Sequence, residues 1–119
     1  MKKLFVLLFS GIQLIAFGQL NMTEVGSLSY GNYLSDIWGY QKVNGDELAL
    51  VTAYDGISIV DISDPTTPNQ IYWKAGNDTW WRDVKTWDKY AYLVTEANEG
   101  MYIVDLEALP GTVNEKYYT

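Results

Sequence analysis

The chain has 119 residues, of which 48% are hydrophobic, with 15 acidic against 8 basic residues and neither cysteine nor histidine. The lack of cysteine excludes disulfides, thiolate nucleophiles, iron–sulfur clusters and cysteine-ligated zinc. The lack of histidine excludes a Ser-His-Asp relay, a histidine general base and an HExxH metal site. The length allows one domain at most.

The first residues are organised like a secretory signal peptide. Lys2 and Lys3 form a basic start, residues 4–17 are an almost unbroken apolar run, and Ala16-Phe17-Gly18 is a small-x-small cleavage pattern. An uncleaved membrane anchor is the alternative, but a bilayer span needs roughly 20 apolar residues. We therefore expect residues 1–18 to direct export. Residues 19–119 then form the mature domain, secreted or held at the cell surface, with no transmembrane span.

Removal of the signal changes the composition of what remains. All three phenylalanines lie within it, so the mature chain is rich instead in tyrosine and tryptophan, ten and five residues respectively. Loss of Lys2 and Lys3 leaves six basic against fifteen acidic residues. Nucleic acid and anionic membrane surfaces repel such a chain, so neither is expected as a partner.

An internal repeat runs through the mature chain. Residues 35–38 align with 82–85, residues 50–53 with 93–96, and residues 56–62 with 100–106, at offsets of 47, 43 and 44 residues. A spacing of roughly 40 to 45 residues is typical of one four-stranded propeller blade.

Each repeat predicts a meander of four short strands. Asn44-Gly45 and Asp55-Gly56 are expected to be hairpin turns, because their glycines supply the positive φ angles that two-residue hairpins need. The strands expected in the first repeat are 35–41, 47–53, 57–62 and 70–74, and those in the second are 82–87, 90–95, 101–106 and 113–118.

The apolar runs of the central strands indicate how the sheets are covered. Residues 48–51 and 102–104 are continuously apolar rather than alternating, which predicts burial on both faces. Packing of one blade between two others meets this requirement, whereas a two-sheet sandwich, the structural competitor, buries one face per sheet. We expect an all-β, propeller-like fold: two antiparallel four-stranded blades packed face to face, preceded by one leading strand over Thr23–Ser29.

Several of these segments resemble a known family. ALV at 49–51 with GISIVDISDP at 56–65, and AYLV at 91–94 with GMYIVDL at 100–106, resemble LVIVD repeats. SDIWGY at 35–40 and WRDVK at 81–85 resemble the opening of the choice-of-anchor B family of secreted bacterial proteins. The resemblance covers roughly residues 23 to 110 and implies a β-propeller carried to the cell exterior, with no established reaction.

Two blades are fewer than the roughly four to eight that close a propeller. The chain is therefore expected to be an incomplete propeller that needs further blades. They come either from the rest of a longer protein or from other copies of this chain in a homo-oligomer. Because the open blade faces are apolar, we expect the isolated chain to associate.

Candidate binding residues follow from blade geometry. The loops that join successive blades, and the central hairpin loops, emerge on one face of a propeller. This face is expected to gather carboxylates, amides and indoles that hold an extracellular glycan or protein ligand. The predicted ligand-binding residues are Asp36, Tyr54, Trp80, Trp81, Arg82, Asp83 and Glu96, with Asp55, Asn77, Asp78, Asn98 and Glu99 around them. No cofactor is required, but Asp36, Asp83 and Glu96 are the ligands expected if the face binds Ca²⁺ through oxygen atoms.

Structural roles compete with these assignments. Asp36 and Asp83 stand at strand starts, where a carboxylate accepts backbone N–H groups. Trp38 and Trp87 suit packing between blades. Asp61 and Asp105 suit capping of the turn that follows each third strand, and Arg82 suits pairing with neighbouring carboxylates.

Two classes of function remain. The first is a non-enzymatic binding, adhesion or scaffold module, which needs no catalytic group that the chain lacks. The alternative is a secreted glycan hydrolase in which two of Asp36, Asp83 and Glu96 act as acid and base.

Overall fold

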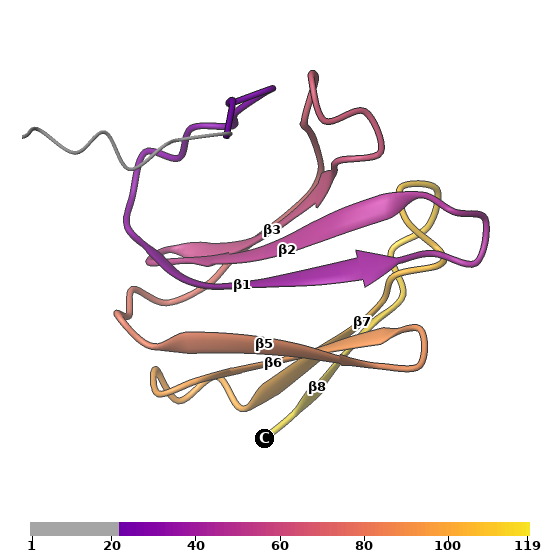
Figure 1. The fold of residues 1–119 in the computed structure, drawn as a ribbon. Coiled ribbons are helices and arrows are strands. Elements are labelled where there is room, and N and C mark those ends of the chain that lie inside the picture. Colours follow the sequence, from indigo (N-terminus) through magenta and orange to yellow (C-terminus); the bar gives the residue numbers. More distant parts are fainter. Residues whose placement is uncertain (1–21) are drawn as a thin grey trace, which may run out of the picture.

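The computed structural model describes residues 22–119, so the predicted signal peptide over residues 1–18 lies outside the described part. Within that part the fold is all-β, with two antiparallel four-stranded meanders and no helix (Figure 1). Sheet 1 consists of β1 Leu34–Gln41, β2 Glu47–Ala53, β3 Gly56–Asp61 and β4 Asn69–Ala75. Sheet 2 consists of β5 Arg82–Trp87, β6 Tyr90–Thr95, β7 Met101–Asp105 and β8 Glu115–Tyr118. The two predicted meanders are confirmed, and no helix of residues 22–119 is long and apolar enough to cross a membrane.

The glycines of the two predicted turns differ in backbone conformation. Gly45 has a φ of 96°, as the hairpin between β1 and β2 requires. Gly56 has no positive φ, so the prediction of a left-handed glycine there is wrong. Gly56 is instead the first residue of β3, and a Cβ atom on it would lie 2.7 Å from the Trp73 ring. Close packing, rather than a left-handed turn, therefore requires glycine at position 56.

Strand register shows how the two repeats correspond. One cross-strand row of sheet 1 and its counterpart in sheet 2 are Asp36–Thr52–Ile57–Lys74 and Asp83–Val94–Met101–Tyr118. The next rows are Trp38–Leu50–Ile59–Tyr72 and Lys85–Tyr92–Ile103–Lys116. These rows keep the predicted offsets of 47 and 44 residues in the first and third strands, but the second strands align at 42 rather than 43. We call the face that carries these rows the forward face of each sheet, and the opposite face its back face.

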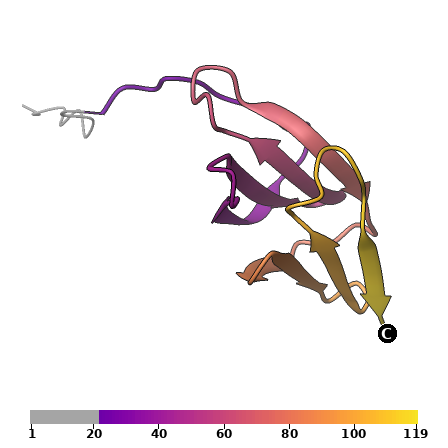
Figure 2. The same ribbon diagram turned by 90° about the vertical axis from the view of Figure 1, so that its right-hand side faces the viewer.

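The two sheets lie one against the other (Figure 2). The residues of their shared core show that the forward face of sheet 1 packs on the back face of sheet 2. Leu50 and Ile59 of the first sheet are fully buried in one cluster with Val84 and Leu93 of the second. Among the described strands, only β1 and β2 bring their Cα atoms within 8 Å of the other sheet, where they approach β5. At the far edge, side chains make the connection: the Tyr72 and Tyr102 hydroxyls meet, and Lys74 Nζ lies 2.9 Å from Glu115 Oε1.

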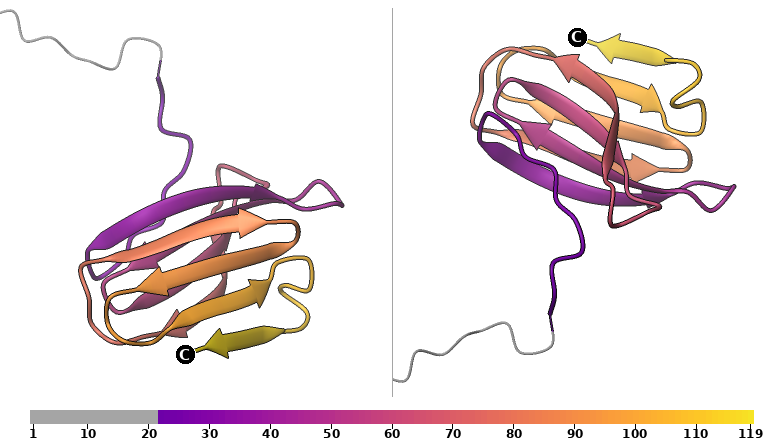
Figure 3. Two further views of the ribbon diagram at one scale, coloured as in Figure 1. Left: turned by 90° about the horizontal axis from the view of Figure 1, so that it is seen from below. Right: turned by 90° about the horizontal axis from the view of Figure 1, so that it is seen from above.

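The N-terminal segment lies on the back face of sheet 1. Residues 22–33 form no strand, so the predicted leading strand over Thr23–Ser29 is wrong. The segment crosses over the strands of the sheet instead of pairing beside them (Figure 3), and the Tyr30 hydroxyl donates to Ser58 Oγ at 2.9 Å. At Gly26 it passes so close to Pro65 that a Cβ atom would lie 2.2 Å from the carbonyl oxygen. A chain lying across a face cannot use its backbone in the ladder of that sheet.

The prediction that both faces of each sheet are buried holds only for sheet 1. The central residues of β2 and β3 are buried on both faces. In β6, burial alternates, because Ala91 and Leu93 on the back face are buried whereas Val94 on the forward face is 46% exposed. Sheet 2 is therefore covered on one face only.

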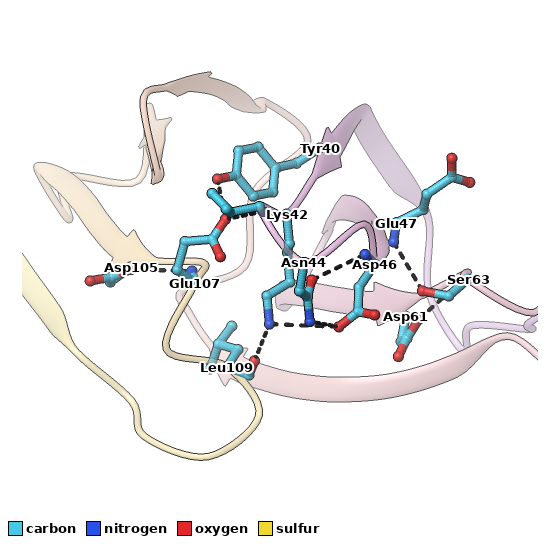
Figure 4. A network of polar contacts seen from close by, with 11 residues as sticks. Tyr40, Lys42, Asn44, Asp46, Glu47, Asp61, Ser63, Asp105, Glu107 and Leu109 are labelled. Carbon is cyan, nitrogen blue, oxygen red and sulfur yellow. Dashed lines mark hydrogen bonds and ion pairs between the residues drawn. The ribbon is translucent and has the colours of Figure 1, made fainter.

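A polar clasp joins the two sheets at the hairpin end of the molecule (Figure 4). The buried Lys42, in the β1–β2 hairpin, donates from Nζ to the carbonyl oxygen of Leu109 at 2.8 Å. Glu107 Oε1 accepts from the Tyr40 hydroxyl at 2.7 Å and from the backbone N–H of Val43 at 3.1 Å. The hairpin of sheet 1 is thereby fixed to the connection between β7 and β8.

Candidate ligand-binding site

Three connections meet at the end of the molecule opposite the clasp. The Thr79 N–H donates to the Tyr54 carbonyl oxygen at 2.9 Å, and the Gly76 N–H donates to the Asp55 carbonyl oxygen at 3.0 Å. The Glu96 N–H reaches the Trp81 carbonyl oxygen at 3.5 Å. The β2–β3 turn, the β4–β5 connection and the start of the β6–β7 connection therefore form one surface, which we call the loop end. This is the grouping of loops that the sequence predicts.

Aromatic side chains dominate the loop end. The Trp80 ring centroid lies 4.8 Å from that of Tyr33 and 5.0 Å from that of Tyr54. Trp80 nevertheless keeps 56% of its surface exposed, and Trp81 beside it keeps 69%. Tilted contacts of this kind hold aromatic rings in a defined arrangement. The result is a supported indole with a second, freer indole next to it.

The loop end also holds an ion pair whose arginine is buried. The guanidinium of Arg82, which is 3% exposed, lies 3.3 Å from Glu99 Oε2 through Nη1 and donates to the Asn77 carbonyl oxygen at 2.8 Å through Nη2. Glu99 Oε1 accepts from the Asn77 N–H at 2.6 Å. A Cβ atom on Gly76 would lie 2.6 Å from Nη1, so the guanidinium would have to shift if a larger residue stood there. Arg82 thus pairs with a carboxylate and shapes the β4–β5 connection, while its own side chain is closed off from solvent.

Asp36 is held between the two sheets. Its Oδ2 atom lies 3.0 Å from Lys85 Nζ and accepts the Val84 N–H at 3.2 Å, while its Oδ1 accepts the Ile37 N–H at 2.8 Å. The hydrogen bond from Lys85, followed by those from the two backbone N–H groups, lowers the pKa of this carboxyl despite the opposing effect of burial. The expectation that Asp36 accepts backbone N–H groups is confirmed.

The structure does not bring the three predicted calcium ligands together. Asp36 points from the forward face of sheet 1 into the interface, whereas Asp83 is exposed on the forward face of sheet 2. Within residues 22–119 no group of three such side chains could hold a metal ion. Calcium binding through Asp36, Asp83 and Glu96 stays a prediction.

The remaining assignments divide between the two ends of the molecule. Asp55 Oδ2 accepts from Asn32 Nδ2 at 2.8 Å at the loop end, while Asp78 and Asn98 stand in its connections. Asp61 and Asp105 accept the N–H groups of Ser63 and Glu107, so their predicted turn-capping role is confirmed.

The two tryptophans predicted to pack between blades behave differently. Trp38 donates from Nε1 to Thr86 Oγ1 at 2.9 Å across the interface and carries Lys85 Nζ 4.5 Å from its ring centroid. Trp87, the last residue of β5, is 78% exposed. Packing between sheets is thus confirmed for Trp38 and not for Trp87.

Tyr33 belongs to the loop end although the sequence does not predict it there. It precedes β1, and its carbonyl oxygen accepts the Tyr54 N–H at 2.8 Å, which extends the pairing of Leu34 with Ala53. The pairing of β1 with β2, continued from Gln41 and Glu47, brings the residues before β1 close to Tyr54. An irregularity between Leu34 and Asp36 shifts the register of this pairing. This shift has no signal in the sequence.

A groove of about 580 Å³ lies on the forward face of sheet 2. Its lining includes Tyr90, Tyr92, Ile103, Lys116 and Tyr118. These residues stand on strands rather than loops. Most of them are the register counterparts of the sheet 1 residues that contact sheet 2. The groove is therefore a surface of a different kind from the loop end.

Comparison of the chain with protein-family models, with curated proteins and with solved structures found no match.

Proposed function

We propose that the chain is an exported, non-enzymatic binding module of the β-propeller type, whose loop end binds carbohydrate. The observation that carries the proposal is the indole pair at this end, with Trp80 supported by Tyr33 and Tyr54 while Trp81 stays exposed. Flat rings with polar edges stack on the apolar faces of sugars, and nearby carboxylates and amides accept and donate hydrogen bonds to their hydroxyls.

The manner of packing supports a propeller over a sandwich. In a sandwich two sheets share one core and leave their outer faces to solvent. Here the forward face of the first repeat meets the back face of the second, and sheet 1 is covered on both faces. Repetition of the same face-to-face step is how blades follow one another, and the resemblance to LVIVD repeats supports the same arrangement.

The charged groups favour binding over catalysis. A hydrolase would need two carboxyl groups flanking a glycosidic bond, one of them with a raised pKa. The pKa of Asp36 is lowered by its hydrogen bond from Lys85, and its Oδ2 atom accepts the Val84 N–H across the interface between the sheets. Arg82 is closed off as well, whereas the indoles of Trp80 and Trp81 stay exposed at the loop end.

A panel of immobilised extracellular glycans, probed with the chain and assayed in parallel for turnover, tests the proposal. We expect binding without turnover, and we expect loss of binding in Trp81→Ala and Trp80→Ala. Trp87→Ala is the matched control, because it removes an exposed tryptophan at the opposite end of sheet 2. Binding that survives both loop-end variants would contradict the proposed site, and cleavage of any bound glycan would favour the hydrolase.

Calcium remains a prediction that the same preparation can test. If the loop end binds Ca²⁺, millimolar Ca²⁺ should raise the melting temperature by mass action. No change in that temperature would leave the indoles as the recognition element.

A further inference from the structure

The exposed indole of Trp81 stands beside two carboxylates. The Glu96 N–H reaches the Trp81 carbonyl oxygen at 3.5 Å, one residue beyond the pairing of Arg82 with Thr95. Trp81 and Glu96 therefore continue the ladder of β5 and β6 by one row, and side chains opposite each other in a ladder lie on the same face. Asp83, two residues after Trp81, lies on that face as well, which is the forward face of sheet 2. All three side chains are exposed.

The interface between the sheets holds the same combination of groups together with an ammonium group. Asp36 and Trp38 are two residues apart on the forward face of β1. Lys85 Nζ lies 4.5 Å from the Trp38 ring centroid and 3.0 Å from Asp36 Oδ2. The π-system of an indole attracts a cation above its face, and the carboxylate adds a charge-assisted hydrogen bond. An indole and a carboxylate at this spacing thus hold an ammonium group in this molecule, and Trp81 and Asp83 have the same spacing.

No basic side chain of residues 22–119 is paired with the carboxylates beside Trp81. This part of the chain has six basic residues, and five of them, Arg82 and Lys85 included, form ion pairs with other carboxylates. The sixth, Lys116, is on β8, the strand of sheet 2 farthest from β5. Asp83 and Glu96 therefore give this part of the loop end a negative charge that suits a cationic ligand.

We propose that the loop end binds an ammonium group over the Trp81 ring, paired with Asp83 and Glu96, and that its carbohydrate ligand is an oligomer of amino sugars with free amino groups. This inference rests on the proposed function, since it names the class of glycan on which the indoles stack. A hexosamine presents an apolar ring face and an ammonium group on one unit, which match an indole and a carboxylate side by side. Glycans that carry carboxylate or sulfate groups are repelled by the same carboxylates.

A basic peptide carries the same charge but matches less of the site. The ammonium group of a lysine ends a flexible stem, which loses rotamer freedom when it is bound. A sugar oligomer has rigid rings, and successive rings can cover the neighbouring indoles of Trp80 and Trp81. The paired indoles therefore favour the amino sugar.

Oligomers of glucosamine and of N-acetylglucosamine, matched in length, test the inference because only the first carries ammonium groups. We expect the glucosamine oligomer to bind about tenfold more tightly at low salt, since a cation–π contact and two exposed ion pairs each contribute a small share. The preference should shrink at about 1 M salt, where the screening length is about 3 Å. Asp83→Asn and Glu96→Gln should each weaken binding of the glucosamine oligomer about threefold and leave binding of the N-acetylated oligomer unchanged.

Asp88→Asn is the matched control for the two carboxylates. It removes an exposed carboxylate beside the exposed Trp87, at the opposite end of β5, and should leave both affinities unchanged. Asp88 has a φ of 52°, a conformation that asparagine also adopts readily, so this variant should fold normally.

The outcomes separate this inference from the proposed function. Equal affinities for the two oligomers, or a preference that persists when Asp83→Asn and Glu96→Gln are combined, would overturn the inference. The proposed function would still stand in that case if Trp81→Ala abolished binding of the N-acetylated oligomer. Undiminished binding of the glucosamine oligomer by Trp81→Ala would overturn the inference in favour of attraction by charge alone. A tetralysine peptide that binds as tightly as the glucosamine oligomer would overturn it in favour of a basic peptide. Failure of both oligomers to bind would overturn it too, and the wider glycan panel would then test the proposed function.

Discussion

Sheet 1 and sheet 2 are built from the same repeat, but their surroundings differ. The residues at positions 50 and 59 are 0% exposed because sheet 2 lies against them. Their counterparts Tyr92 and Ile103 stand in the same rows and have no sheet against them within the described chain. Whether a given position of this repeat is buried therefore depends on the presence of a neighbouring sheet. The residue type at that position indicates only that the position suits such a contact.

The largest expected difference in stability is between two equivalent isoleucines, Ile59 in sheet 1 and its counterpart Ile103 in sheet 2, when each is shortened to alanine. Ile59→Ala opens a cavity between the sheets and should lower the free energy of unfolding by about 2–5 kcal/mol. Ile103→Ala removes the same atoms from a partly exposed site and should cost about 1 kcal/mol or less. Urea unfolding followed by tryptophan fluorescence measures both.

Equal losses in the two variants would show that the forward faces are equivalently buried. If Ile59→Ala does not fold, Ile59→Val and Ile103→Val carry the same comparison, with about 0.5–1.5 kcal/mol expected for the buried position.

The clasp offers a second contrast, between lysines near the two hairpins. Lys42→Met keeps the apolar stem but leaves the buried Leu109 carbonyl oxygen without its donor, which should cost about 1–3 kcal/mol. Lys89→Met removes an ion pair with Asp105 from a side chain that is 41% exposed; because the Asp105 side chain is 8% exposed but keeps the Glu107 N–H as a donor, about 1 kcal/mol is expected. Denaturant unfolding distinguishes them, and a larger loss for Lys89→Met would show that the clasp does not hold the sheets together.

A smaller effect should come from the segment that covers sheet 1. Tyr30→Phe removes the hydrogen bond to Ser58 and should cost about 0.5–1.5 kcal/mol while increasing amide exchange in residues 22–33. Tyr33→Phe is the control, because its ring packs on Trp80 and its hydroxyl has no hydrogen-bond partner among the described residues. Unchanged exchange in Tyr30→Phe would mean that other contacts hold the segment in place.

The smallest expected effect is a change in pH dependence at Asp36. The folded pKa of this carboxyl lies below its unfolded value, so its contribution to stability is present above about pH 4 and is lost as pH falls through the folded pKa. Asp36→Asn should therefore be less stable than the unmodified chain at pH 6, with the gap narrowing on acidification. Unfolding free energies measured between pH 6 and pH 3 check this, and a gap that stays constant with pH would contradict this role of Asp36.

The sequence predicts the strands well because their signals are local. Three strands, β2, β5 and β6, have the predicted bounds, and the others differ by one or two residues at an end. Short apolar runs bounded by turn residues such as Asn44-Gly45 specify a hairpin within a short window. The grouping of Tyr54, Trp80 and Trp81 at one end then follows from the order of the strands.

The missed features depend on contacts that no local pattern encodes. Residues 23–29 have the composition of a strand, but the back face of sheet 1 holds them across its strands. The clasp joins Lys42 to the carbonyl oxygen of Leu109. Every residue has such a carbonyl group, so the residue type at position 109 does not reveal the contact. Asp36 and Asp83 look alike in sequence, and only the presence or absence of a following sheet separates their roles.

The contacts across the interface also bear on how the chain folds. Thr52 reaches the backbone 30 residues ahead, Trp38 reaches a partner 48 residues ahead, and Lys42 reaches one 67 residues ahead. Each sheet can form its own hairpins from nearby residues, but the forward face of sheet 1 stays open until residues as far as Leu109 are available. Loop closure must therefore precede burial, and long sequence separations of this kind slow folding. Assembly of the two sheets, rather than formation of either one, should set the folding rate of the domain.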